Sequence, residues 1–267
     1  MLLRWVTGLA AASVMILTAW GGGYSFFWLG FILALLTVAA VEWAELAGAS
    51  RPIVVSTILL GAVLTLLSHW GLLPLRLWEY LPVLLFLPTA AVIYYQDPGR
   101  GQDTVWAAAG IIWLSVPASL LYMIREQYEF VAIMVLMIGT IFQDSLALYT
   151  GYLFGGDRPF TPGLSPNKTW AGFTGGLLGM ILVVAGGGFL MEWPLYVSLP
   201  TGLTLGLVGQ AGDLSISALK RRMDVDDTGQ FFPGHGGILD RCDALIFNAA
   251  VFYPVCRLVE TYDLYLG

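Results

Sequence analysis

Long uninterrupted apolar runs, separated by short polar breaks, are the dominant pattern along this chain. A run of about 18 or more apolar residues is typical of a transmembrane helix, because it can cross the hydrocarbon core of a bilayer. The pattern predicts nine spans, at roughly residues 5–20, 24–44, 53–70, 77–95, 104–123, 128–154, 171–191, 195–219 and 243–261. We therefore expect an all-α, polytopic integral membrane protein with about nine transmembrane helices.

No linker or internal repeat divides the chain, which predicts a single transmembrane domain over residues 1–267. Within it, residues 1–127 are expected to form a scaffold of N-terminal helices with dimer contacts, and residues 128–267 to hold catalytic helices and loops. The first apolar run resembles a signal peptide but is long for one, so we interpret it as a retained helix.

Nine spans place the polar connections at 45–52, 96–103, 155–170 and 220–242 on one side of the membrane, and both termini on the other. Lys and Arg favour the cytoplasmic side. Eight basic residues lie on the polar-loop side (Arg51, Arg100, Arg158, Lys168, Lys220, Arg221, Arg222, Arg241) and four on the other (Arg4, Arg76, Arg125, Arg257). The prediction is a cytoplasmic-membrane protein whose polar loops face the cytoplasm and whose N-terminus lies on the opposite side.

The composition fits a membrane protein, with 58% hydrophobic and 11% charged residues and a mean hydropathy of +0.78. The formal net charge of −6 argues against nucleic acid as a partner, because no basic stripe is available to neutralise phosphates. Asp144 lies inside the span 128–154, eleven residues before Gly155, or roughly 16 Å along a helix. A carboxylate at that depth is a functional candidate, although a hydrogen bond to a neighbouring helix remains an alternative.

Further acids and a lysine recur near the last two spans. Asp213, Ser217 and Lys220 share one helical face. Asp240 and Asp243 stack at the start of the final span, where complementing the helix dipole is a simpler role that stays open. Oxygen ligands from Asp213, Asp240 and Asp243, with Asp144 above them, suit a hard cation such as Mg²⁺, and a second cation is left open.

The loop before the span 171–191 reads "GGDRPFTPGLSPNKTWAGFTGG". Lys168 and Thr169 lie near that helix's N-terminus, where anions bind readily, although such a loop can also be a simple connector. Loops 155–170 and 220–242 flank one transmembrane hairpin and emerge on the same side. Together they predict a Mg²⁺–polyphosphate site at a membrane surface.

The segment "SISALKRRMDVDDTGQFFPGHGGILDRCDAL" resembles the signature of the phosphatidate cytidylyltransferases, or CDP-diacylglycerol synthases. "SPNKTWAGFTGG" resembles the second landmark of that family, and "DSLALYTGYLFG" matches the preceding segment more loosely. The resemblance covers roughly residues 140–250 and is far more specific than a lone Gly-rich loop. The residues that fit the signature are Ser217, Lys220, Arg221, Asp227, Gly229, Pro233, His235, Gly236, Gly237, Asp240, Arg241 and Asp243.

The resemblance implies an enzyme that converts CTP and phosphatidic acid to CDP-diacylglycerol and pyrophosphate, requires Mg²⁺, and often forms a homodimer in the lipid membrane. Asp213, Asp240 and Asp243 would hold the metal, with Lys168 and Lys220 completing the catalytic set. The substrate-binding set would be Ser165, Asn167, Lys168, Thr169, Ser217, Lys220, Arg221, Asp227, His235, Gly236, Gly237 and Arg241. His235 is expected to contact phosphate or nucleotide rather than act as a base.

Three positions depart from the family pattern. Asp226 stands where the family has Lys, a swing of two charge units that we expect to weaken binding of an anionic substrate. Cys242 replaces an apolar residue, and Ala171 stands where many relatives have Glu.

Other functions remain as alternatives. A CTP-dependent polyprenol or dolichol kinase would transfer the γ-phosphate instead, and a cation or proton transporter would use Asp144 and Asp213 as relay acids. A CDP-alcohol phosphotransferase is disfavoured, because its spaced Asp and Gly pattern is absent.

Overall fold

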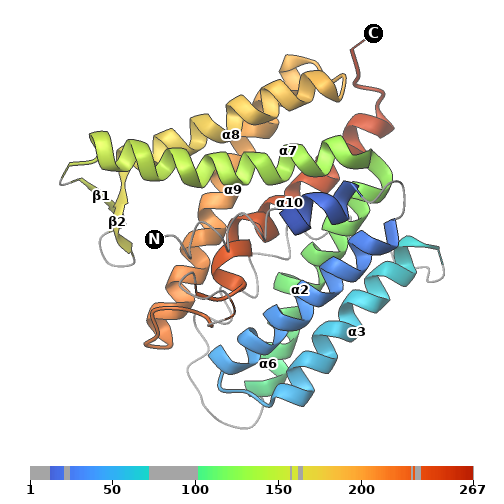
Figure 1. Cartoon of the computed structure of the whole chain (residues 1–267), viewed down its shortest axis with the longest axis vertical. Coiled ribbons are helices and arrows are strands. Elements are labelled where there is room, and N and C mark those ends of the chain that lie inside the picture. Colours follow the sequence, from blue (N-terminus) through green and yellow to red (C-terminus); the bar gives the residue numbers. More distant parts are fainter. Residues whose placement is uncertain are drawn as a thin grey trace. The chain divides into compact units, whose positions relative to one another are not determined.

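A computed structural model describes residues 13–20, 25–71, 102–156, 158–161, 165–229, 231 and 236–266. Helices make up almost all of its secondary structure (Figure 1). A helix over 13–20 precedes the labelled elements. These are α2 (Ser25–Leu46), α3 (Arg51–His69), α6 (Gln102–Gly110), η3 (Ile111–Ser115), α7 (Val116–Phe154), β1 (Pro159–Thr161), β2 (Ser165–Thr169), α8 (Trp170–Leu190), α9 (Leu195–Arg222) and α10 (Leu239–Thr261).

The chain folds into two compact units, residues 1–126 with 219–242, and residues 127–218 with 243–267. We call them the first and the second unit. The boundary passes through α7, α9 and α10, and it leaves the start of α10 in the first unit. The segment 219–242 therefore folds with the N-terminal helices, although the sequence places it between two C-terminal spans. The predicted single domain stays a prediction.

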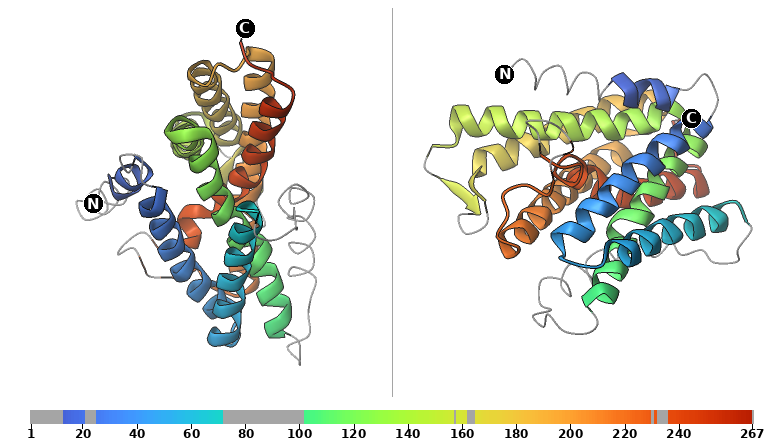
Figure 2. Two further views of the ribbon diagram at one scale, coloured as in Figure 1. Left: turned by 90° about the vertical axis from the view of Figure 1, so that its right-hand side faces the viewer. Right: turned by 60° about the horizontal axis from the view of Figure 1, so that its bottom comes forward.

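In the first unit, α2, α3 and α6 lie side by side (Figures 1 and 2). Their packing centres on Trp43, whose indole nitrogen donates to the carbonyl of Trp106 at 2.9 Å. A Cβ at Gly110 would lie 2.5 Å from Cδ1 of Ile58, so glycine at this position leaves room for the Ile58 side chain between α3 and α6. This packing fixes the end of α2, where the buried Glu42 precedes Trp43.

In the second unit, glycines let the membrane helices approach backbone to backbone. The buried face of α8 consists largely of small residues, and a Cβ at Gly176 would lie 3.0 Å from the carbonyl oxygen of Gln143 in α7. On α9, a Cβ at Gly202 would lie 2.8 Å from the Cα of Ile181 in α8. Interfaces of small residues are typical of helix packing in membranes, because lipid provides no hydrophobic drive between helices.

Four helices among the described residues are long and apolar enough to cross a membrane: Phe26–Leu46, Val105–Phe154, Trp170–Leu190 and Leu239–Thr261. The all-α, multi-pass membrane protein is thus confirmed, whereas the nine predicted spans are not. The span 77–95 and the first half of 5–20 lie outside the described residues. The apolar part of α3 is shorter, and α9, which carries Asp213 and three basic residues in its last turn, is not among the four.

The spans predicted at 104–123 and 128–154 form one helical stretch of 50 residues, Val105–Phe154. A bilayer core needs only about 20 helical residues. The stretch is interrupted at Glu129, whose φ of 64° and ψ of −173° are not helical. The prediction therefore identified two segments correctly but placed the break a few residues early, at 124–127.

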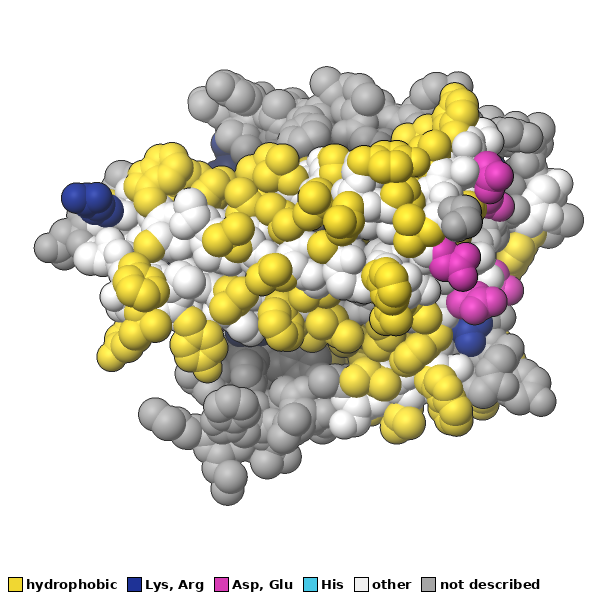
Figure 3. Space-filling model, turned by 90° about the horizontal axis from the view of Figure 1, so that it is seen from above, with side chains coloured by type: hydrophobic (Ala, Val, Ile, Leu, Met, Phe, Trp, Pro, Cys, Tyr) yellow, Lys and Arg dark blue, Asp and Glu magenta, His cyan; other side chains and the backbone are white. Residues whose placement is uncertain are grey.

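Hydrophobic side chains cover the middle of the face seen in Figure 3, and the charged side chains visible there lie toward its margins. Large exposed apolar residues of α8 include Leu178, Leu182, Phe189 and Leu190. A surface of this kind is stable against lipid rather than water.

The predicted polar connection 155–170 contains a small antiparallel hairpin of β1 and β2, with Thr161 opposite Ser165 and Pro159 opposite Thr169. This hairpin is a small local addition to an all-α architecture. The hairpin is short and its register is irregular, so it offered no alternating pattern for sequence analysis to detect.

Candidate functional site

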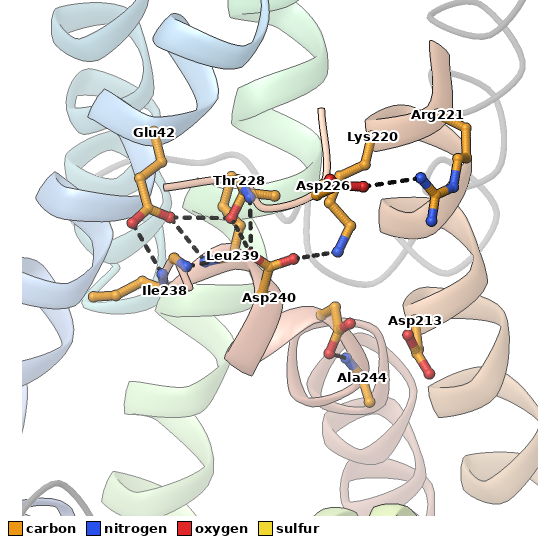
Figure 4. Close-up of polar contacts among 12 residues, drawn as sticks. Glu42, Asp213, Lys220, Arg221, Asp226, Thr228, Ile238, Leu239, Asp240 and Ala244 are labelled. Carbon is orange, nitrogen blue, oxygen red and sulfur yellow. Dashed lines mark hydrogen bonds and ion pairs between the residues drawn. The ribbon is translucent and has the colours of Figure 1, made fainter. Parts of the chain in front are cut away.

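The first unit contains a hydrogen-bonded group of polar side chains that joins α2, the end of α9 and the start of α10 (Figure 4). We call Glu42, Lys220, Thr228 and Asp240 the loop cluster. Asp240 is its centre: Oδ1 accepts from Lys220 Nζ at 2.7 Å, and Oδ2 accepts from Thr228 N at 2.8 Å and Thr228 Oγ1 at 2.9 Å. The amide of Gly237 also donates to Oδ2, at 3.2 Å. Asp240 therefore ties loop 226–237 to α9 and α10.

Glu42 was not among the residues singled out from the sequence. It is 5% exposed, and its two carboxylate oxygens accept the amides of Ile238 and Leu239, each at 3.0 Å. These amides lie at the N-terminus of α10, where unpaired N–H groups and the helix dipole favour a carboxylate. A signal was available, because Glu42 is an acid inside the predicted span 24–44 and intramembrane acids are functional candidates.

Two glycines of the loop are required by this arrangement. A Cβ at Gly229 would lie 2.5 Å from Glu42 Oε1, and one at Gly237 would lie 2.5 Å from Glu42 Oε2. Gly236 has a φ of +82°, a conformation that other residues rarely adopt. The glycines of the predicted signature therefore allow the backbone to close around Glu42 and Asp240.

The remaining predicted residues of this segment lie at its surface. Arg221 pairs with Asp226 at 3.2 Å, and both side chains are largely exposed. Asp227 and Arg241 are exposed as well. Asp226, which stands where the family has Lys, thus pairs with Arg221, an arginine that we predicted would bind phosphate. His235 and Pro233 lie outside the described residues.

The second unit contains a separate group, Asp144, Asp213, Asp243 and Lys168, which we call the acidic cluster. Lys168 Nζ lies 2.5 Å from Asp213 Oδ2. The charges of Asp213, Asp144 and Lys168 all act on the Asp243 carboxylate. The cluster therefore brings carboxylates from α7, α9 and α10 near one ammonium, and carboxylate oxygens are ligands for a hard cation.

Glycines of α9 explain how two of these acids come together. A Cβ at Gly209 would lie 2.8 Å from Asn248 Nδ2, and one at Gly212 would lie 2.8 Å from the carbonyl oxygen of Asp243. The backbones of α9 and α10 are therefore in close contact beside Asp213, which follows Gly212. Asp144, on α7, is exposed at its place in the long helix.

The hairpin supplies the other predicted residues of this unit. Ser165, Asn167 and Lys168 belong to β2, and only the side chain of Asn167 lies outside the described ones. Thr169 caps α8, its hydroxyl accepting the amide of Gly172 at 3.1 Å, which confirms the predicted helix start. Ser217 lies on α9, one turn after Asp213 and half-buried.

The predicted metal ligands are not arranged as a finished metal site. Among the side chains that the structure describes, no three of Asp, Glu, His or Cys are arranged to hold an ion. The donor chemistry nevertheless fits Mg²⁺, because the acids of this cluster offer carboxylate oxygens. The metal assignments to Asp144, Asp213, Asp240 and Asp243 stay predictions.

Comparison with known proteins gives a consistent result across the chain. The model of the cytidylyltransferase family matches residues 2–259. A phosphatidate cytidylyltransferase of Brucella melitensis is 32% identical, over 94% of this chain and 91% of the relative. The enzymes of that name from Thermotoga maritima and Helicobacter pylori are 33% and 32% identical over 64% and 65% of this chain, and 66% and 63% of their own lengths.

Proposed function

Because this chain belongs to the cytidylyltransferase family, we propose that it transfers the cytidylyl group of CTP to phosphatidic acid, giving CDP-diacylglycerol and pyrophosphate. The names of relatives that align over nearly the whole chain support this choice of substrates. The sequence "SPNKTW" and the segment 217–243 support it independently.

The observation that carries the proposal is that each cluster pairs a lysine ammonium with a carboxylate, Lys168 with Asp213 and Lys220 with Asp240. A metal–nucleotide complex carries both a cation, which carboxylates can bind, and phosphates, which ammonium groups can bind. Binding it would exchange internal ion pairs for contacts to the substrate. Neither lysine is far from solvent, with 29% and 20% of their side chains exposed.

We assign Asp213, Asp240, Asp243 and Asp144 to holding Mg²⁺, with a second cation left open. When bound, Mg²⁺ would neutralise charge on the triphosphate and on the departing pyrophosphate. Asp240 Oδ1 accepts from Lys220, and a carboxylate oxygen has two lone pairs, so it can take a further partner.

The protein residues would act by binding and orienting the two anionic substrates. A phosphatidate oxygen forms a bond to the α-phosphorus of CTP, the bond from that phosphorus to the bridging oxygen breaks, and pyrophosphate leaves with the electron pair. The nucleophile is already an anion, so no general base is needed. Lys168, Lys220, Arg221 and Arg241 would bind phosphates, which lowers the barrier by positioning and charge stabilisation.

The proposal also covers further substrate contacts, the oligomeric state and the membrane location. Substrate contacts are assigned to Ser165, Asn167, Thr169, Ser217, Asp227, His235, Gly236 and Gly237. We also propose nine spans, a homodimer, and a place in the cytoplasmic membrane with the polar loops in the cytoplasm. The bias of basic residues supports this orientation.

The test is an assay of the purified full chain with CTP, phosphatidic acid and Mg²⁺. We expect CDP-diacylglycerol to form, EDTA to stop the reaction, and excess Mg²⁺ to restore it. Release of CDP in place of CDP-diacylglycerol would identify a CTP-dependent lipid kinase. Turnover that is unchanged in EDTA would refute the metal assignment.

A further inference from the structure

We propose that Glu42, on the N-terminal helix α2, is a positioning residue that holds the described parts of the loop before α10, residues 226–229 and 236–237, and the N-terminus of α10 in the arrangement that the reaction requires. This inference rests on the proposed function for its catalytic part. Its structural part, that Glu42 holds the loop, stands by itself. Nothing in the sequence resemblance assigns a role to this residue.

The first argument is burial. Glu42 is 5% exposed and lies in a helix long and apolar enough to span a membrane. An acid in this environment is costly unless its charge is bound by donors. Both carboxylate oxygens are bound here, by the amides of Ile238 and Leu239 at 3.0 Å.

The second argument is the connection from Glu42 to the proposed site residues. Thr228 Oγ1 donates to Asp240 Oδ2 at 2.9 Å and lies 3.5 Å from Glu42 Oε2, so the Thr228 side chain stands between the two carboxylates. Asp240 in turn binds Lys220. All four side chains belong to the first unit, and Figure 4 shows Glu42, Thr228, Asp240 and Lys220 following one another.

The third argument is steric. Gly229 and Gly237 both lie against the Glu42 carboxylate, where any Cβ would approach to 2.5 Å. Both glycines therefore contact the Glu42 side chain. Moving Glu42 would release Gly237, whose amide donates to Asp240.

Glu42→Gln is the direct test, because it keeps the size of the side chain but replaces one accepting oxygen with a donor. Hydrogen exchange of the full chain, followed by mass spectrometry, should show faster exchange at Ile238 and Leu239. The matched control is Glu45→Gln, one turn further along α2, where the carboxylate is exposed and pairs with Arg51. The control should exchange like the unchanged protein.

Kinetics separate positioning from a general loss of folded protein. In Glu42→Gln we expect the Mg²⁺ concentration for half-maximal activity, or the KM for CTP, to rise about 10-fold or more, as for other residues that orient metal ligands. Thr228→Val should shift the same constants, and the double variant should be no worse than the poorer single one. A drop in kcat alone, with KM and Mg²⁺ dependence unchanged, would overturn the positioning role.

Other outcomes are equally decisive. Unchanged exchange at residues 238 and 239 would refute the claim that Glu42 holds the loop. If the unchanged protein makes no CDP-diacylglycerol, the proposed function fails, and with it the catalytic role of Glu42, while exchange still decides the structural one. If Glu42→Gln does not fold, Thr228→Val and Glu42→Asp carry the test, and normal constants in both would contradict the proposal.

Discussion

The loop cluster and the acidic cluster use the same residue types in opposite ways. In the loop cluster, Asp240 receives four hydrogen bonds and its side chain is 8% exposed. In the acidic cluster, Lys168 pairs with Asp213, which is 36% exposed, while the like charges of Asp213 and Asp144 act on the Asp243 carboxylate. The first arrangement stabilises a folded loop, whereas the second brings like charges together. A carboxylate in this chain is therefore understood from its donors, not from its place in a motif.

Asp243→Asn gives the largest expected effect on activity. Loss of a proposed metal ligand should reduce CDP-diacylglycerol formation by at least about 100-fold. Because Asp243 is partly buried and the like charges of Asp213 and Asp144 act on it, the same change should leave the thermal midpoint unchanged or raise it. Asp263→Asn, at an exposed acid near the C-terminus, is the control and should alter neither quantity. A destabilised Asp243→Asn would mean that the two clusters do not differ as described.

Asp240→Asn should show the opposite pattern in stability. The variant leaves Lys220 without its ionic partner and turns an amide toward buried donors, which we expect to cost about 3 kcal/mol of unfolding free energy. Denaturation of the purified protein in detergent measures this. The comparison is Asp226→Asn, which also removes an ion pair but at the surface, and should cost less than about 1 kcal/mol. Equal stability losses in the two variants would contradict the contrast.

Asp226→Lys should have a smaller effect, and in the favourable direction. The change releases Arg221 from its exposed partner and restores the family's charge. Since a surface ion pair is worth up to about 1 kcal/mol, the KM for CTP should fall by roughly fivefold or less. The gain should shrink as salt increases. A higher KM at low salt would show that Asp226 does not oppose substrate binding.

The extent of prediction differs along the chain. Thr169 was placed correctly near the start of α8, because the change from a polar loop to a long apolar run is a local signal. The apolar run of the last helix was placed from residue 243, with Asp240 and Asp243 at the helix start, and α10 begins at Leu239. Hydropathy locates the apolar part of a helix, whereas its polar first turn is capped by Glu42, 197 residues away from Leu239.

The sequence predicted which residues belong to the site, but not which of them pair with each other. Lys220 and Asp240 were both named from the sequence, and the structure brings them to 2.7 Å. Lys168 and Asp213 were assigned to phosphate and metal, and the structure pairs them with each other. Sequence spacing gives helical faces, but it cannot say which charges meet when elements 45 residues apart pack together.

The most direct measurement follows the phosphorus atoms of CTP in the reaction with phosphatidic acid and Mg²⁺. With CTP labelled at the α-phosphorus, the label should appear in the lipid fraction as CDP-diacylglycerol. With CTP labelled at the γ-phosphorus, it should appear only in pyrophosphate, in equal molar amount. A γ-label found in the lipid, or an α-label recovered as soluble CDP, would contradict cytidylyl transfer by this chain.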